Sequence, residues 1–171
     1  MGFRKGKSLK DFLVRAKVPP LVRKEGKSEG CGKTNCGVCK FVKCTSSFHC
    51  SKGTQYKIRD VQLNCNSSNI VYLLCCKSCN VQYVGSCSTK FRLRFNNYKS
   101  CNTKHRDKPV AQQHLHDHFD LPGHNGTADW EFVLIDQAEN KDEVRKRERF
   151  WQYKLETFLP CGLNDREVYT M

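Results

Sequence analysis

The sequence has no apolar run long enough to cross a membrane and no apolar signal segment near its first residue. The lack of both argues against a membrane protein and against a secreted one. Twelve cysteines in 171 residues could by number alone form a disulfide scaffold, but they cluster at the short spacings typical of metal ligands. We therefore expect a reducing, intracellular location, with zinc rather than disulfides as the partner of several thiols.

Acidic residues are scarce in the first part of the chain. Residues 1–60 contain 15 Lys and Arg against 4 Asp and Glu, which leaves only +2 of the total charge of +13 for residues 61–171. Residues 1–30 combine this charge with Pro19-Pro20 and a Gly- and Ser-rich stretch, a composition that does not pack alone. The pattern predicts a flexible basic arm. Three interpretations of its charge are a solvated run with no partner, a nuclear-localisation signal, and a segment that contacts nucleic-acid phosphates.

A Cys-rich linker follows at residues 31–66. The Cys36-x-x-Cys39 pair is half of a zinc site, and its spacing predicts a small zinc knuckle. The other ligands stay ambiguous among Cys31, Cys44, His49, Cys50 and Cys65. Apolar residues at Tyr56, Ile58, Val61 and Leu63 indicate one or two strands at the end of this linker.

Residues 70–85, IVYLLCCKSCNVQYVG, predict two strands that pair around a tight Cys-rich turn. Pairing brings Tyr72 and Tyr83 close together, and Gly85 lets the backbone approach a ligand or turn sharply. Two phenols on a rigid platform suit proton transfer at a phosphodiester. The alternative is an ordinary hairpin with two tyrosines at the edge of the core.

Three further elements complete a domain that we place at residues 67–171. Residues 88–95 open with helix-capping residues and put Phe91 and Phe95 on one face. Residues 130–136, WEFVLID, predict a third strand, and residues 143–158 predict an amphipathic helix with these core contacts: Val144, Phe150, Trp151, Leu155 and Phe158. The expected fold is α/β (α+β), with a small central antiparallel three-stranded sheet flanked by helices.

The hairpin, written VY…YVG, resembles the opening hairpin of GIY-YIG nucleases, and the later residues follow in that family's order. The resemblance implies that an arginine of the first helix faces the scissile phosphate, and Arg94 matches best, with Arg92 as the rival on another side of the helix. It also implies that Glu148 holds Mg²⁺ or Mn²⁺ and that Asn164 closes the domain. A solvated partner of neighbouring helix residues is the alternative for Glu148. Tyr72 would act as general base or orient a water, supported by Tyr83.

The resemblance narrows to the endonuclease of Penelope-like retroelements, which carries a zinc-binding insertion. Here the matching residues are Cys76 and Cys79 in the hairpin turn with His118 and His124 downstream. Two thiolates and two imidazoles form a closed tetrahedral site, the chemistry of structural zinc. His114 and His116 remain alternative ligands, and a redox pair of cysteines is disfavoured in a hairpin turn. Cys75 should point to the opposite side of its strand and pack.

The resemblance implies a metal-dependent DNA endonuclease of retroelement origin, located in the nucleus, with the basic arm on DNA phosphates. A catalytically inactive, zinc-stabilised nucleic-acid-binding module is the alternative. Two departures bear on activity: Tyr98 stands where the branch often has a histidine, and Ser86 follows YVG in place of an acidic residue. No paired-aspartate polymerase motif is present, so we expect a fragment, truncated copy or free-standing derivative, with reverse transcriptase supplied elsewhere.

Overall fold

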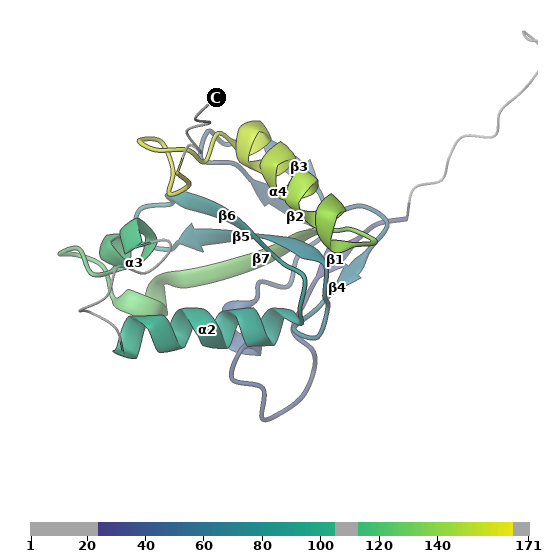
Figure 1. Ribbon diagram of the computed structural model, residues 1–171, viewed down its shortest axis with the longest axis horizontal. Helices are drawn as coiled ribbons and strands as arrows, with labels where there is room; N and C mark the ends of the chain where they lie inside the picture. The colour runs from purple at the N-terminus through teal and green to yellow at the C-terminus, as the bar shows by residue number, and fades with distance from the viewer. Residues whose placement is uncertain (1–23, 105–112, 166–171) are drawn as a thin grey trace, which may run out of the picture.

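The computed structural model describes the backbone of residues 24–104 and 113–165 and the side chains of residues 24–100 and 115–165. Most of the predicted basic arm, residues 1–23, lies outside the described residues. Within the described part, the longest helices are too short or too polar to cross a membrane. The chain order of strands and helices is shown in Figure 1.

The centre of the fold is an antiparallel three-stranded sheet in the order β6-β5-β7. Its strands are β5 (Ile70–Cys76), β6 (Gln82–Cys87) and β7 (Trp130–Gln137). The hairpin β5–β6 and the third strand lie where the sequence pattern places them. The predicted α/β (α+β) fold, a three-stranded antiparallel sheet flanked by helices, is therefore confirmed.

The register of the hairpin puts both tyrosines on one face of the sheet. Tyr72 lies opposite Gly85, and Leu74 lies opposite Tyr83. Because side chains alternate along a strand, Tyr72 and Tyr83 are diagonal neighbours on the same face. All four strand positions are buried, so the two phenols are part of the core as well as candidates for chemistry.

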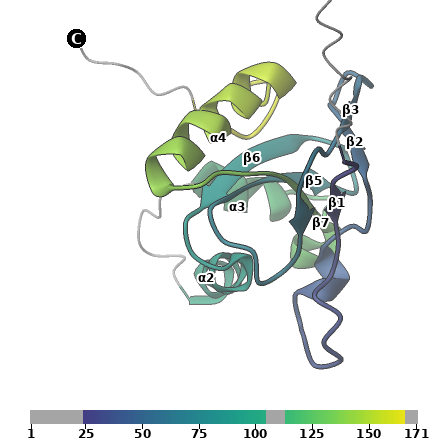
Figure 2. The same cartoon turned by 90° about the vertical axis from the view of Figure 1, so that its right-hand side faces the viewer.

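Helix α2 (Phe91–Lys104) and the short α3 (Gln113–Phe119) cover the tyrosine face. Phe91 and Phe95 of α2 are buried there against Phe132 of β7, with ring centroids 5.3 and 5.7 Å away. Edge-to-face contacts of this kind add to the free energy of burying the rings. In Figure 2, α2 and α4 lie on opposite sides of the sheet.

Helix α4 (Lys141–Leu155) covers the other face, where Val144 and Leu155 are buried. Asn140 caps its first turn by accepting a hydrogen bond from the Glu143 backbone amide. The prediction that Phe150 is a core residue is wrong, because its side chain is 54% exposed. Six residues after Val144, it falls on a different side of a helix with 3.6 residues per turn. Phe158 follows the end of the helix and is half-buried.

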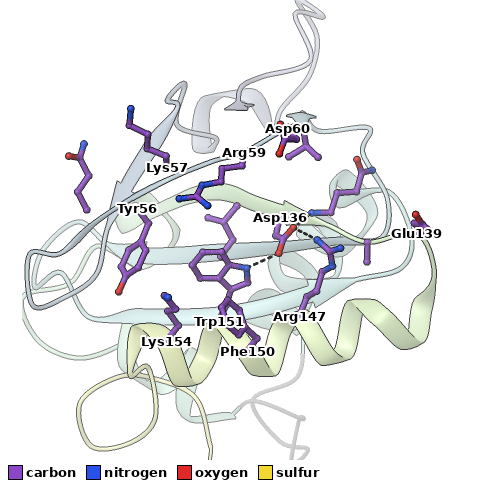
Figure 3. Close-up of a pocket in the computed structure, with 15 residues that line it drawn as sticks. Tyr56, Lys57, Arg59, Asp60, Asp136, Glu139, Arg147, Phe150, Trp151 and Lys154 are labelled. Atoms are coloured by element: carbon purple, nitrogen blue, oxygen red, sulfur yellow. Dashed lines mark hydrogen bonds and ion pairs between the residues drawn. The ribbon is translucent and has the colours of Figure 1, made fainter. Parts of the chain in front are cut away.

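Asp136 of β7 fixes α4 to the sheet. Its carboxylate accepts hydrogen bonds from the Arg147 guanidinium at 2.7 Å and from the Trp151 indole at 2.9 Å. Figure 3 shows this network on the wall of a cavity of about 770 Å³, between α4, β7 and residues 55–61. None of the predicted catalytic residues lines this cavity. The hydrogen bonds of Asp136 on its wall join α4 to β7.

Residues 24–66 pack along the outer edge of β7. They form two small sheets and a 3₁₀ turn, with these bounds: β1 (Lys27–Ser28), η1 (Cys39–Phe41), β2 (Ser47–His49), β3 (Gln55–Lys57) and β4 (Gln62–Leu63). The Lys43 amide donates to the Phe132 carbonyl, and the Leu134 amide donates to the Ser28 hydroxyl. These bonds satisfy backbone groups that an uncovered edge strand would expose.

Candidate active site and metal centres

A buried cluster of polar groups forms where α2 crosses the hairpin. The hydroxyl oxygens of Tyr72 and Tyr98 are 2.7 Å apart. Arg94 donates from Nε to the Tyr72 hydroxyl and from Nη2 to the Tyr98 hydroxyl, both at 3.3 Å. The guanidinium also lies 4.6 Å from the centre of the Tyr98 ring, within cation–π range. Of the two arginines proposed, Arg94 is the one that the structure brings to Tyr72, whereas Arg92 is exposed.

The glycine of the second strand makes this cluster possible. A Cβ atom on Gly85 would lie 2.6 Å from the Tyr72 hydroxyl and 2.8 Å from the Tyr83 ring. Distances this short do not occur between real side chains, so any larger residue would displace one tyrosine. Gly85 was expected from the sequence to let the backbone approach a ligand or turn sharply, whereas in the structure the groups closest to it are the two tyrosines.

Burial controls the protonation of the two phenols. It raises the pKa of Tyr72 well above its usual value, and Tyr98 and Tyr83 add to the effect, whereas the charge of Arg94 opposes it. Burial also raises the pKa of Tyr83, with further contributions from Tyr98 and Glu148. Both phenols are therefore neutral at ordinary pH. Burial alone would lower the pKa of Arg94, but its tyrosine partners raise it, so the guanidinium stays charged.

Glu148 approaches the same strand from α4. Its Oε2 accepts a hydrogen bond from the Ser86 hydroxyl at 2.6 Å. The side chain is half-buried and lines a cavity of about 500 Å³ with Arg145, Arg149 and Gln152. Ser86 follows Gly85, which lies against the Tyr72 hydroxyl that Arg94 contacts. The carboxylate from α4 and the Arg94–Tyr72 pair therefore lie beside adjacent residues of the edge strand β6.

Asn164, also predicted as a catalytic residue, bonds to the backbone of β6. Its Oδ1 accepts from the Val84 amide at 2.9 Å, and its Nδ2 donates to the Val84 carbonyl at 2.8 Å. The side chain is buried. These bonds attach the segment after α4 to β6, so the structure gives Asn164 a part in positioning the strand that carries Tyr83 and Ser86.

Residues 68–159 match the model of the GIY-YIG catalytic domain. The match covers more than half of the chain. The chain belongs to the GIY-YIG family. This is a family of nucleases, whose substrate is nucleic acid and which generally use divalent metals. No curated protein and no solved structure matches the chain.

The GIY-YIG domain brings together the four residues predicted to hold the first zinc. The ligand atoms of Cys76, Cys79, His118 and His124 all lie within 4.8 Å of one another. The Nε2 atoms of His118 and His124 are 3.4 and 3.5 Å from the Cys79 sulfur. Tetrahedral zinc, with Zn–S about 2.3 Å and Zn–N about 2.0 Å, spaces neighbouring ligands by about 3.5 Å. The donor set and its spacing therefore fit a structural zinc ion.

Neighbouring residues that were alternatives for this site lie elsewhere. His116 is buried, with its ring centroid 6.3 Å from that of Tyr98. Cys75 is half-buried and accepts a hydrogen bond from Gln82. The His114 side chain falls outside the described residues.

Asp129 supports the cysteine turn of the GIY-YIG domain and was not predicted from the sequence. Its carboxylate accepts from the Ser78 hydroxyl at 2.8 Å and from the Asn125 amide at 2.7 Å. These hydrogen bonds lower the pKa of Asp129. The 3₁₀ turn η2 (Gly126–Asp129) and the hairpin turn meet only in the folded chain, so no local pattern reveals the contact.

A second cluster holds four cysteines beside the GIY-YIG domain: Cys31, Cys36, Cys39 and Cys65. The sulfur of Cys39 lies 3.6 Å from that of Cys31 and 3.7 Å from that of Cys65. These distances exceed a disulfide bond and fit the spacing of about 3.8 Å between thiolates on tetrahedral zinc. Burial opposes ionisation of Cys36, but hydrogen bonds from Val38 and the neighbouring cysteines lower its pKa to about 7. Cys44, His49 and Cys50 are not in the cluster.

Proposed function

We propose that this protein is a metal-dependent endonuclease that hydrolyses phosphodiester bonds of DNA. The observation that carries the proposal is that the Arg94–Tyr72 pair and Glu148 lie beside adjacent residues, Gly85 and Ser86, of the edge strand β6 in a GIY-YIG domain. Arg94 arrives from α2, Tyr72 from β5, and Glu148 from α4 through its hydrogen bond to Ser86. A fixed cation and a carboxylate that can hold a metal ion suit phosphodiester hydrolysis, because both can stabilise charge that develops in the transition state.

Arg94 would bind the scissile phosphate and stabilise the negative charge that grows on it during attack. Its bonds to Tyr72 and Tyr98 fix the guanidinium before substrate arrives, which lowers the reorganisation needed in the transition state. Tyr72 would orient the attacking water through its hydroxyl, because its raised pKa disfavours the phenolate that a general base needs. Tyr83 supports this arrangement from the next strand.

Glu148 would hold the divalent cation. It lines an open cavity, and the other residues lining it are two arginines and a glutamine. A site with a single carboxylate suits Mg²⁺ or Mn²⁺, which keep most of their waters and bind through phosphate oxygens of the substrate. When bound, the ion supplies charge stabilisation to the leaving oxygen. Ser86 orients the carboxylate toward that position.

The two clusters of thiols and imidazoles would hold structural zinc. The site in the hairpin turn supports the finer resemblance to the endonuclease of Penelope-like retroelements, since Cys76 and Cys79 lie within the GIY-YIG hairpin and His118 and His124 follow its first helix. With this resemblance we propose a retroelement origin, a nuclear location and a reverse transcriptase supplied elsewhere. Zinc held by these four residues would fix the position of the hairpin turn relative to the histidine segment.

The test is cleavage of supercoiled plasmid by zinc-loaded protein with Mg²⁺ or Mn²⁺, scored for nicked and linear DNA. We expect Glu148→Gln to lower the cleavage rate about 10³-fold or more, since it removes the only carboxylate proposed on the cation, and to leave DNA binding intact. Glu139→Gln is the matched control, because Glu139 is exposed and lies outside the site. Equal cutting by Glu148→Gln and the unchanged chain contradicts the role assigned to Glu148. Absence of metal-dependent cutting by the unchanged chain favours the inactive nucleic-acid-binding module.

A further inference from the structure

A basic groove lies between α2 and the loop that holds the four cysteines. Its volume is about 290 Å³. Three cations line it, Lys33 from the loop with Arg92 and Lys99 from α2, together with the amides of Asn35 and Asn96. Among the described residues that line the groove there is no carboxylate. Its charge and its hydrogen-bonding groups therefore both suit an anion.

The groove lies on a different flank of α2 from the catalytic cluster. Arg92, Asn96 and Lys99 are spaced i, i+4 and i+7, which places them on one stripe of a helix, and all three are exposed. Arg94 is half-buried and turns to Tyr72 instead. Phe91 is fully buried against the sheet between these two flanks. Helix α2 thus presents cations on both sides.

The cysteine cluster fixes the far wall of the groove. The Cys31 amide donates to the Cys39 sulfur, and the Arg92 amide donates to the carbonyl of Cys65. The rings of Phe41 and Phe95 pack with centroids 4.8 Å apart. The loop that carries Lys33 is therefore held against α2 by contacts that zinc bound to these thiols would strengthen.

We propose that this groove binds the phosphate backbone of duplex DNA, as a second contact beside the one made by Arg94. The inference deepens the proposed nuclease function and rests on it for the identity of the anion. A helix is about 10–12 Å across with its side chains, and the major groove of B-DNA is about 12 Å wide. The two flanks of α2 therefore match the phosphates on either side of one groove.

The experiment measures binding of a labelled duplex by chain carrying Glu148→Gln, at about 50 to 200 mM salt, where phosphate contacts dominate the salt dependence. Adding Arg92→Glu with Lys99→Glu should weaken binding more than tenfold and reduce the slope of log affinity against log salt by about 1.8, or about 0.9 for each phosphate that the protein no longer neutralises. Lys57→Glu with Arg59→Glu is the matched control. It makes the same change in charge at exposed residues beside a different cavity.

The groove is supported if its variant loses much more affinity than the control. An equal loss in both means that only net charge matters, and no loss means that DNA does not contact the groove; either result overturns the proposal. Arg92→Gln with Lys99→Gln, which adds no repulsion, should show a smaller loss in the same direction, and thermal unfolding checks that each variant is folded. Failure of the unchanged chain to cut plasmid would refute the nuclease function separately, since binding is measured without cleavage.

Discussion

The hydroxyl group of Tyr98 joins the two groups expected to act on the phosphate. It is the hydrogen-bond partner of both Tyr72 and Arg94, and its side chain is 4% exposed. The structure shows that a tyrosine at this position reaches both partners. We infer that Tyr98 positions Arg94 and Tyr72.

Replacing Tyr98 tests this inference. Tyr98→Phe should lower the cleavage rate about 10- to 100-fold, because small displacements of a catalytic group have effects of this size. Tyr98→His should retain more activity, since imidazole can still accept from Arg94. Both are measured by plasmid cleavage at saturating DNA, with the exposed Tyr153→Phe as control. A Tyr98→Phe protein as active as the unchanged chain would show that the hydroxyl has no part in positioning.

Tyr72 should make stability depend on alkaline pH. Its pKa is raised in the folded chain, whereas an unfolded tyrosine ionises near pH 10. The stabilisation from keeping the phenol neutral is thus fully present below about pH 10 and is lost as pH rises toward the folded pKa. Thermal midpoints between about pH 8 and 11 should fall less steeply for Tyr72→Phe than for the unchanged chain. Parallel curves would contradict the assigned shift.

At the scale of elements, each candidate metal site combines a closely spaced pair of cysteines with one or more ligands from a distant segment of the chain. The β5–β6 turn contributes Cys76 and Cys79, and the segment after α2 contributes His118 and His124. In the second cluster, Cys65 lies 26 residues after Cys39. Zinc at such sites contributes directly to the free energy of folding, because the unfolded chain has no preformed site.

Metal content distinguishes the two clusters. We expect two zinc ions per chain, and one each in Cys76→Ser and Cys36→Ser, whereas Cys161→Ser should retain both because Cys161 is exposed and belongs to neither cluster. Each ligand variant should unfold at a lower temperature, and a strong chelator should destabilise the unchanged chain. The readouts are elemental analysis and thermal unfolding under reducing conditions. Metal-free protein with unchanged stability would refute both sites.

At the scale of the whole molecule, residues 24–66 and the GIY-YIG domain share one core. Val38, Leu63 and Cys65 are buried in the same cluster as Tyr72 and Phe91. The linker also completes the hydrogen bonding of the outer edge of β7. The basic arm expected from composition extends to residue 30, but residues 24–30 are part of the folded structure.

Two deletions separate charge from packing. Residues 1–23 contain seven Lys and Arg and one Asp, so their removal should weaken binding to all duplexes and flatten its salt dependence, with little change in stability. Removal of residues 1–30 should in addition lower the unfolding temperature, because it takes away β1 and the Ser28 hydroxyl that accepts from Leu134. Binding titrations and thermal unfolding measure the two effects. If the salt dependence of DNA affinity is unchanged after removal of residues 1–23, these residues serve in targeting and not in DNA binding.

Local patterns in the sequence determined the presence of the three sheet strands and the two longer helices, and they predicted that Tyr72 and Tyr83 lie close together. Strand alternation and helical periodicity depend on residues a few positions apart, so they can be read directly from the chain. The short spacing of Cys36 and Cys39, and of Cys76 and Cys79, indicated half of each metal site for the same reason. The order of the motifs indicated the family.

Only the tertiary structure decided which distant residues complete the second cysteine cluster and which side chain supports Glu148. It selected Cys31 and Cys65 over Cys44, His49 and Cys50, and it placed the Ser86 hydroxyl on Glu148, 62 residues away. It also exposed Phe150 while burying Tyr98. These outcomes depend on how α2, α4 and the linker pack on the sheet, and packing between segments far apart in the chain leaves no periodic signal in the sequence of either one.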